Sequence, residues 1–320
     1  MVRTCQKELE RKKPKMKKLA VWMLILALIL GCAACGAEEA AALKLSAPTG
    51  APALAVATMA VDHPENYTFL DASTIGAEFQ KNEADFIIAP INAGAKLFKA
   101  GKSTYQLAAV VTWGNLYFAS QREDFTAESL SGADLTLFGE NTINASVVLA
   151  VLEAKGLTPK SVNYLAGAAE TQAELLNSPE AIVVTADPAV TAAKIKNENV
   201  KTLSVEDMLQ EAFGMEGYTQ AGLFVRAETA AEQPEAVTGY LTAVEEAAGK
   251  AETDVAALAE AAVALEILPN AKVAAAAIPG CHIRYVAAAD AKAEIEKTVA
   301  FDPSQFGGDV PAAEFYYDVK

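Results

Sequence analysis

The sequence predicts an α/β fold of two lobes, in which mostly parallel sheets are covered by helices on both faces. Short buried strands alternate with helical segments from residue 43 to about residue 200, a pattern typical of parallel α/β sheets. The last third is mostly helical and must pack on a sheet formed earlier in the chain. With 320 residues, 52% of them hydrophobic, the chain is long enough for two lobes.

A charge-free segment near the N-terminus predicts export. The run LAVWMLILALILG (19–31) follows the basic RKKPKMKK (11–18). As a helix the run would be about 20 Å long, whereas a bilayer core is roughly 30 Å thick. A basic region before a short apolar core is typical of a secretory signal peptide, which we place at residues 1–31. A buried core helix is the alternative, and Met16 is an alternative start.

A cysteine stands directly after this run. The residues ILG (29–31) precede Cys32 in an order that resembles the lipobox of bacterial lipoproteins. The resemblance implies that Cys32 carries lipid and that residues 32–42 form a tether. Cys35 is the rival, but Cys32 would then stand where an aliphatic residue is expected.

Cys32→Ala is expected to leave an unprocessed precursor in a bacterial host and to abolish lipid labelling, because the thiol that accepts the lipid is gone. Metabolic labelling with a fatty-acid analogue measures this, and Cys35→Ala serves as the normally labelled control. Labelling that survives in Cys32→Ala but disappears in Cys35→Ala would place the anchor at Cys35. The two acyl chains of a processed lipoprotein would hold the protein stably at a membrane.

The body of the chain contains strand-like runs, most of them followed by a turn and a helix. Strands are expected at residues 43–47, 84–90, 105–113, 115–120, 133–139, 180–186 and 221–228. Two further helices are expected at 233–251 and 254–268, without a convincing strand after them. The helical end must pack on the first sheet, so the strand at 221–228 returns the chain to it.

This return divides the body into two parts, of which the first is discontinuous in sequence. We place lobe 1 at residues 43–118 plus 225–320 and lobe 2 at residues 119–224. The chain is expected to cross between them near Trp113 to Ser120 and again near Tyr218 to Arg226.

Four strand-to-helix turns offer small or polar residues just before a helix. They are PTGAP (48–52), PINAG (90–94), GENTIN (139–144) and TADPA (185–189). In open α/β sheets, ligands bind beyond the carboxyl ends of the strands, where helix N-termini present free N–H groups. Two turns belong to each lobe, which favours a cleft between them. Taken singly, each turn is also explained by ordinary helix capping and turn chemistry.

Charge and composition exclude several functions. The net charge is −15 and residues 1–31 carry +6, so the remainder carries −21. An acidic body without a basic stripe excludes nucleic-acid binding. The four cysteines do not form a disulfide framework, and two histidines, His63 and His282, are too few for a typical zinc site. We expect no cofactor, and the absence of a G-x-x-x-x-G-K-[ST] loop argues against ATP hydrolysis.

An ordered set of segments runs between residues 43 and 317: LKLSAPTGAPALA, EADFIIAPINAGAKLFKAG, LAAVVTWGNLYF, SLSGADLTLFGENT, VVTADPAVTAA, AIPGCHIRYV and FGGDVPAAEFYY. This set resembles the substrate-binding proteins of ABC importers, in the branch of nitrate, sulfonate and taurine binders. The resemblance implies a type II periplasmic-binding-protein fold with two hinge crossings. It also implies a monomer outside the cell membrane that passes a solute to a permease and its ATPase.

The turns and the resemblance together give the candidate ligand-binding residues. They are Thr49, Gly50, Asn92, Thr112, Trp113, Asn141, Thr142, Thr185, Asp187 and His282. His282 departs from the amide expected there in the family. It is either a ligand contact or a packed structural residue.

The sequence alone leaves two alternatives: a ligand sensor for a membrane receptor, and an enzyme of the same fold, of the type that makes pyrimidine or menaquinone precursors. Cys281 and His282 are adjacent in sequence, which does not establish a nucleophile and base, and we expect no enzyme activity. None of the four turns holds Lys or Arg, while Glu140 and Asp187 would repel an anion. This favours a neutral, heteroaromatic or amine-bearing ligand.

Overall fold

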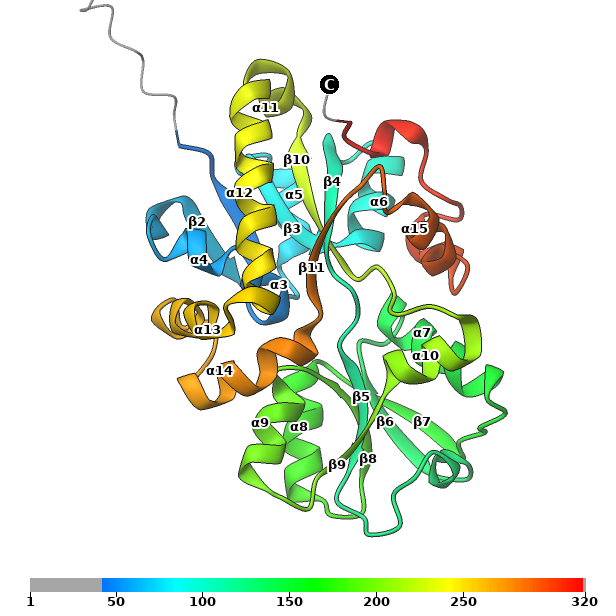
Figure 1. The fold of residues 1–320 in the computed structure, drawn as a ribbon. Helices are drawn as coiled ribbons and strands as arrows, with labels where there is room; N and C mark the ends of the chain where they lie inside the picture. Colours follow the sequence, from blue (N-terminus) through cyan, green and yellow to red (C-terminus); the bar gives the residue numbers. More distant parts are fainter. Residues whose placement is uncertain (1–41, 319–320) are drawn as a thin grey trace, which may run out of the picture. The chain divides into compact units, whose positions relative to one another are not determined.

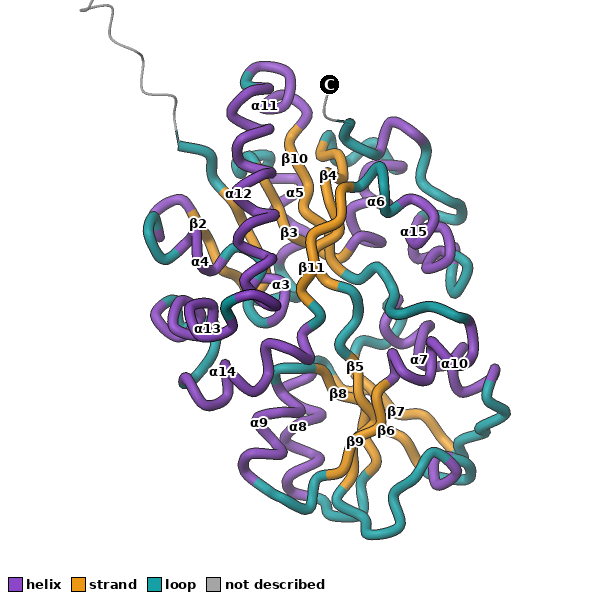
Figure 2. Tube along the Cα trace, viewed as in Figure 1, coloured by secondary structure: helices purple, strands orange, loops and turns teal. Residues whose placement is uncertain are grey.

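The computed structural model describes residues 42–318, so the predicted signal peptide, Cys32 and nearly all of the predicted tether lie outside the described residues. Two β-sheets form the framework of this part (Figures 1 and 2). The six-stranded sheet contains, in spatial order, β11 (Ile283–Ala287), β4 (Tyr105–Thr112), β10 (Ala221–Arg226), β3 (Phe86–Pro90), β1 (Leu45–Pro48) and β2 (Tyr67–Leu70). The five-stranded sheet contains β7 (Ser161–Leu165), β6 (Asp134–Phe138), β8 (Ile182–Ala186), β5 (Leu116–Ser120) and β9 (Lys201–Ser204).

Helices cover both faces of the six-stranded sheet, as predicted for an α/β fold. In β3, Phe86 and Ile88 pack into one apolar core, and the alternate residues Ile87 and Ala89 pack into the other. Successive side chains of a strand point to opposite faces, so burial of all four requires cover on both sides. The helices, in chain order, are α3 (Ala51–Leu54), α4 (Ala57–Ala60), α5 (Ile75–Lys81), α6 (Ile91–Lys99), α7 (Ile143–Ala154), α8 (Ala168–Asn177), α9 (Ala189–Lys196), α10 (Val205–Phe213), α11 (Ala227–Glu232), α12 (Pro234–Thr253), α13 (Val255–Ala264), α14 (Ala271–Ala277) and α15 (Lys292–Val299).

Both sheets are mixed, but most strands of each sheet run in one direction, as expected: β10 and β11 are the exceptions in the first sheet and β5 in the second. β1 lies parallel to β2 and β3, but β10 lies antiparallel to β3 and β4, and β11 antiparallel to β4. In the second sheet, β6 lies parallel to β7 and β8, whereas β5 lies antiparallel to β8 and β9. The reason is topological. β5 and β10 each receive the chain from the other sheet, so they run opposite to the strands that end at the crossings.

The chain crosses between the sheets at residues 113–115 and 214–220, within or beside the two predicted positions. The backbone N–H of Gln220 donates to the Thr112 carbonyl at 3.1 Å, which ties the second crossing to the start of the first. A further contact between the two halves comes from α14, which packs against α9 (Figure 1). The strand β11 that follows α14 corrects the expectation of helices alone in the last third.

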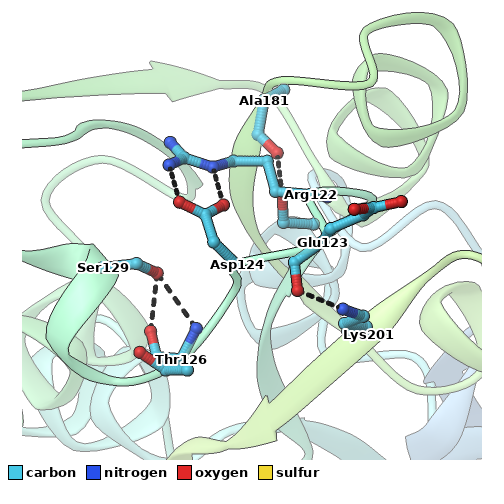
Figure 3. A network of polar contacts seen from close by, with 8 residues as sticks. Arg122, Glu123, Asp124, Thr126, Ser129, Ala181 and Lys201 are labelled. Atoms are coloured by element: carbon cyan, nitrogen blue, oxygen red, sulfur yellow. Dashed lines mark hydrogen bonds and ion pairs between the residues drawn. The ribbon is translucent and has the colours of Figure 1, made fainter.

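Because β5 starts at the first crossing, the loop after it lies at the other end of the second sheet. Figure 3 shows the polar contacts of this loop. Arg122 donates two hydrogen bonds to Asp124, Nε to Oδ1 at 3.0 Å and Nη2 to Oδ2 at 2.8 Å. Lys201 donates to the carbonyl of Glu123, and the Ser129 hydroxyl to the carbonyl of Thr126. Asp124 is largely exposed, and such pairs contribute little to stability, so the network orders this loop without contributing to the candidate site.

Within residues 42–318, no helix is both long enough and apolar enough to cross a membrane.

Candidate functional site

The strand registers place the four predicted turns at the crossing ends of their sheets. Ala221, where the chain enters β10, pairs with Pro90 at the end of β3 and with Thr112 at the end of β4. β1 is parallel to β3, so it too ends at the crossings. In the second sheet Leu116, just after the first crossing, pairs with Ala186 at the end of β8, and β6 runs parallel to β8. The carboxyl ends of β1, β3, β6 and β8 therefore all lie at the crossing end of their own sheet.

The turns after β1 and β3 offer polar groups in different ways. Thr49 is exposed, and its backbone N–H donates to the Leu70 carbonyl at 2.8 Å. Gly50 has a φ of 95°, a left-handed conformation that side-chain-bearing residues rarely adopt. Asn92 lies in the first turn of α6, and its Oδ1 is buried without a hydrogen-bond partner among the described residues. Asn92 thus retains an unused acceptor.

Two of the candidate threonines are engaged within the protein. Thr112 and Thr185 are completely buried. The Thr112 hydroxyl accepts from the N–H of Ala221 at 3.0 Å, and the Thr185 hydroxyl donates to the Ala168 carbonyl at 3.2 Å. These bonds give both side chains a structural role, and their proposed ligand contacts stay predictions.

The turn after β6 holds a second pair of candidates. Asn141 is exposed and has a φ of 58°, which asparagine tolerates better than most residues. Thr142, immediately before α7, donates its hydroxyl to the Gly139 carbonyl at 2.6 Å. The Thr142 hydroxyl therefore closes its own turn. Whether either residue contacts a ligand stays a prediction.

Trp113 and His282 meet at the first crossing although they are far apart in sequence. The Trp113 backbone N–H donates to the His282 carbonyl at 3.2 Å, and His282 Nδ1 lies 2.9 Å from the Gly114 carbonyl oxygen. The indole Nε1 donates to the Arg284 carbonyl at 3.0 Å, and the Arg284 guanidinium lies 4.4 Å from the centre of the ring. Only 6% of Trp113 is exposed. The pair thus joins β4 to the segment that precedes β11.

The Asp187 side chain lies in close contact with the segment that precedes β11. The short helix η3 (Ile278–Cys281) brings Gly280 so close that a Cβ at this position would lie 2.0 Å from Asp187 Oδ2 and 2.8 Å from the Tyr117 hydroxyl. The Thr191 N–H donates to Asp187 Oδ1 at 3.2 Å. Burial raises the pKa of Asp187, and the Thr191 hydrogen bonds and His282 partly offset this. Asp187 therefore lies at a tight contact between the second sheet and η3.

Two adjoining cavities lie where the crossings meet these segments, and we call them together the crossing groove. The larger, about 520 Å³, is lined by Trp113, Glu216, Ala251, Glu252, Val255, Ile278, Pro279, His282, Ile283 and Arg284. The smaller, about 420 Å³, is lined by Tyr117, Ser204, Glu206, Asp207, Gln210, Glu216 and His282. Both volumes lie in the range of small-molecule sites. Trp113 and His282 are the sequence candidates in these walls, and the other eight do not line either cavity.

Glu206 is the most unusual group in the crossing groove. Only 4% of it is exposed, and its Oε1 accepts from the Leu116 N–H at 3.1 Å. Burial raises its pKa to about 7. Glu206 was not predicted as a site residue from the sequence. Ser204 and Asp207 have the spacing of a helix N-cap and its first turn, so Glu206 looks like an ordinary acidic residue of that turn. The cap is real: the Asp207 N–H donates to the Ser204 hydroxyl at 3.0 Å.

The sequence matches no protein-family model and no curated protein at a significant level, but solved structures share its fold. An ABC transporter protein from Parabacteroides distasonis superposes with a TM-score of 0.72 at 20% identity, covering 87% of this chain and 99% of that one. The periplasmic aliphatic sulphonate binding protein SsuA from Escherichia coli gives a TM-score of 0.67 at 15% identity, over 86% of this chain and 92% of SsuA. The chain has the fold of ABC-transporter substrate-binding proteins.

This substrate-binding-protein fold also occurs in an enzyme. The desulfurization enzyme DSZB gives a TM-score of 0.56 at 12% identity, covering 85% of this chain and 96% of that one. In the present chain, Cys281 is completely buried and burial raises the pKa of its thiol far above the ordinary value. A buried thiol of raised pKa is a poor nucleophile. Within residues 42–318, no group of three His, Cys, Asp or Glu side chains is placed to hold a metal ion.

Proposed function

We propose that this protein is an extracytoplasmic solute-binding lipoprotein, which captures a small molecule between two lobes and delivers it to an ABC permease and its ATPase. The observation that carries the proposal is the placement of the strand ends. Turns from both sheets lie at the crossing ends, where ligands bind in open α/β folds. The shared fold with SsuA supports the same function.

The two sheets suggest how capture would work. Each lobe is proposed to contain one sheet. The bounds expected from the sequence, 118/119 and 224/225, move to the crossings, because they would divide β5, which begins at Leu116, and β10, which begins at Ala221. Residues 113–115 and 214–220 would then absorb the rotation that closes one lobe on the other. A ligand that contacts both lobes would favour the closed state through its additional contacts there.

Binding without chemistry is the function we favour over catalysis. The likeness to DSZB is the observation that favours an enzyme. Against it stands the buried Cys281, because neither its exposure nor its pKa suits nucleophilic attack. The proposal therefore assigns no catalytic residue and no cofactor.

Ligand binding is expected to change the fluorescence of Trp113. This side chain is buried at the first crossing between His282 and Arg284, so lobe closure would alter its surroundings. In a full-length chain that carries Trp22→Phe, Trp113 is the only tryptophan. Compounds that raise the melting temperature should change its emission, and compounds that do not should leave it unchanged.

Trp113→Phe in the same background removes the signal and separates two roles of the ring. Calorimetric binding that persists in this variant would identify the ring as a filler of the crossing, whereas lost binding with an intact fold would identify a stacking surface. A compound that binds without any change in Trp113 emission would contradict a moving crossing at this residue.

A further inference from the structure

The walls of the crossing groove carry more negative than positive charge. Four carboxylates line it: Glu206, Asp207, Glu216 and Glu252. Among the described residues in these walls, Arg284 is the only Lys or Arg. Arg284 lines the larger cavity but not the smaller one, and its guanidinium packs over the Trp113 ring. The smaller cavity thus has three carboxylates and neither Lys nor Arg in its wall.

The buried carboxylate lacks a cationic partner. Glu206 Oε1 accepts from the Leu116 N–H, but Oε2 has only a long contact with the Ser204 hydroxyl at 3.5 Å. Between residues 42 and 318, no Lys, Arg or His nitrogen lies within 4.0 Å of this carboxylate. Buried charges in proteins are normally paired, because desolvation of a lone charge is costly. A positively charged group in the smaller cavity would supply the missing partner.

The larger cavity offers an apolar surface beside this charge. Val255, Ile278, Pro279 and Ile283 line it together with the Trp113 indole. Glu216 and His282 belong to the walls of both cavities, so the apolar surface and the carboxylates are neighbours. The groove therefore suits a molecule with two chemically different ends.

We infer that the crossing groove binds a small molecule in which an amine, or another cationic nitrogen group, is joined to a compact apolar body. The inference rests on the proposed function, because it names the ligand class of that binding protein. The cationic group lies beside Glu206, Asp207 and Glu216, and the apolar body lies against Ile278, Ile283 and Trp113. An anionic ligand such as a sulfonate is disfavoured, because these carboxylates would repel it.

A thermal-shift screen of the full-length chain in mild detergent tests the inference. The library holds equal numbers of size-matched amines, neutral compounds and anions, built on series such as benzylamine, benzyl alcohol and benzenesulfonate. Amines are expected to raise the melting temperature, and calorimetry then gives the Kd of the strongest one. Glu216→Gln and Asp207→Asn should each weaken that binding about fivefold or more, because each removes a nearby negative charge.

Glu235→Gln is the matched control, since Glu235 is an exposed acid in the first turn of α12 that does not line the groove. Its Kd should equal that of the unmodified protein. Stabilisation by anions instead of amines would overturn the inference and leave the proposed function standing. Equal amine binding by all three variants would also overturn it, because the cation would then lie outside the groove. If no compound of any class stabilises the protein, the proposed function fails together with the inference.

Discussion

Gly280→Ala is expected to destabilise the protein strongly. The new methyl group would lie 2.0 Å from Asp187 Oδ2 and 2.8 Å from the Tyr117 hydroxyl, so either η3 or these side chains must shift. Overpacking of this kind typically costs about 1–3 kcal/mol. The expected loss lies at the upper end, because Asp187 is buried and is held by the Thr191 N–H. Urea unfolding of the full-length chain measures it.

Gly249→Ala provides the matched control for this methyl group. Gly249 is exposed on α12, and no atom lies within 4 Å of the position of its Cβ. The change should be neutral or stabilise by about 0.5–1 kcal/mol, as expected for glycine replaced within a helix. If Gly280→Ala unfolds at the same urea concentration as Gly249→Ala, the close contact between η3 and Asp187 does not exist in solution.

Glu206→Gln is expected to stabilise the ligand-free protein above pH 7. Burial raises the pKa of Glu206 from an ordinary 4.5 to about 7. Below pH 4.5 the carboxyl is protonated in both the folded and unfolded chains, so it carries no penalty. Between pH 4.5 and 7 the folded chain keeps a proton that the unfolded chain releases, so stability falls as the pH rises. Above pH 7 the full penalty applies, at most about 3 kcal/mol.

The variant removes this penalty but keeps an oxygen that can accept from the Leu116 N–H. Urea unfolding should therefore show a gain of about 2–3 kcal/mol at pH 8 and little difference near pH 4. The charged and titratable groups around this site are unchanged in the variant; they are Asp207, Glu216, Tyr117, Tyr218 and His282. Glu235→Gln should leave the pH profile as it is. A Glu206→Gln profile parallel to that of the unmodified protein would contradict the burial of an ionisable carboxylate here.

The same substitution should act in the opposite direction on ligand affinity. If the crossing groove binds a cation, loss of the Glu206 charge should weaken amine binding while the ligand-free protein becomes more stable. Opposite effects on stability and binding are the usual signature of a functional residue held in an unfavourable environment.

Inner strands were more predictable from the sequence than edge strands. β1, β3, β4, β5, β6, β8 and β10 correspond to predicted strands, and each lies inside its sheet. β2, β7, β9 and β11 are the four sheet edges, and none of them was predicted. Tyr67–Leu70 in β2, for example, has no fully buried residue. An edge strand lacks the continuous apolar run that marks a strand buried on both faces.

Only part of the candidate site could be predicted from the sequence. The four turns could be predicted because each follows a buried strand and precedes a helix, and the registers place them at the crossing ends. The acidic wall of the crossing groove could not be predicted, because Glu206 and Glu216 become neighbours of His282 only in the folded chain. The carboxylate of Glu206 is buried by tertiary packing, while its sequence neighbours indicate only the start of a helix.

On the proposed function, the protein binds a small solute and releases it unchanged. The most direct test combines the thermal-shift screen of the full-length chain with mass spectrometry of the solute recovered from the stabilised complex. A ligand that binds only the folded state raises the melting temperature by mass action. We expect saturable stabilisation with one solute per chain and recovery of the solute at its original mass. A solute recovered as a chemically altered product would identify an enzyme and contradict the proposed binding function.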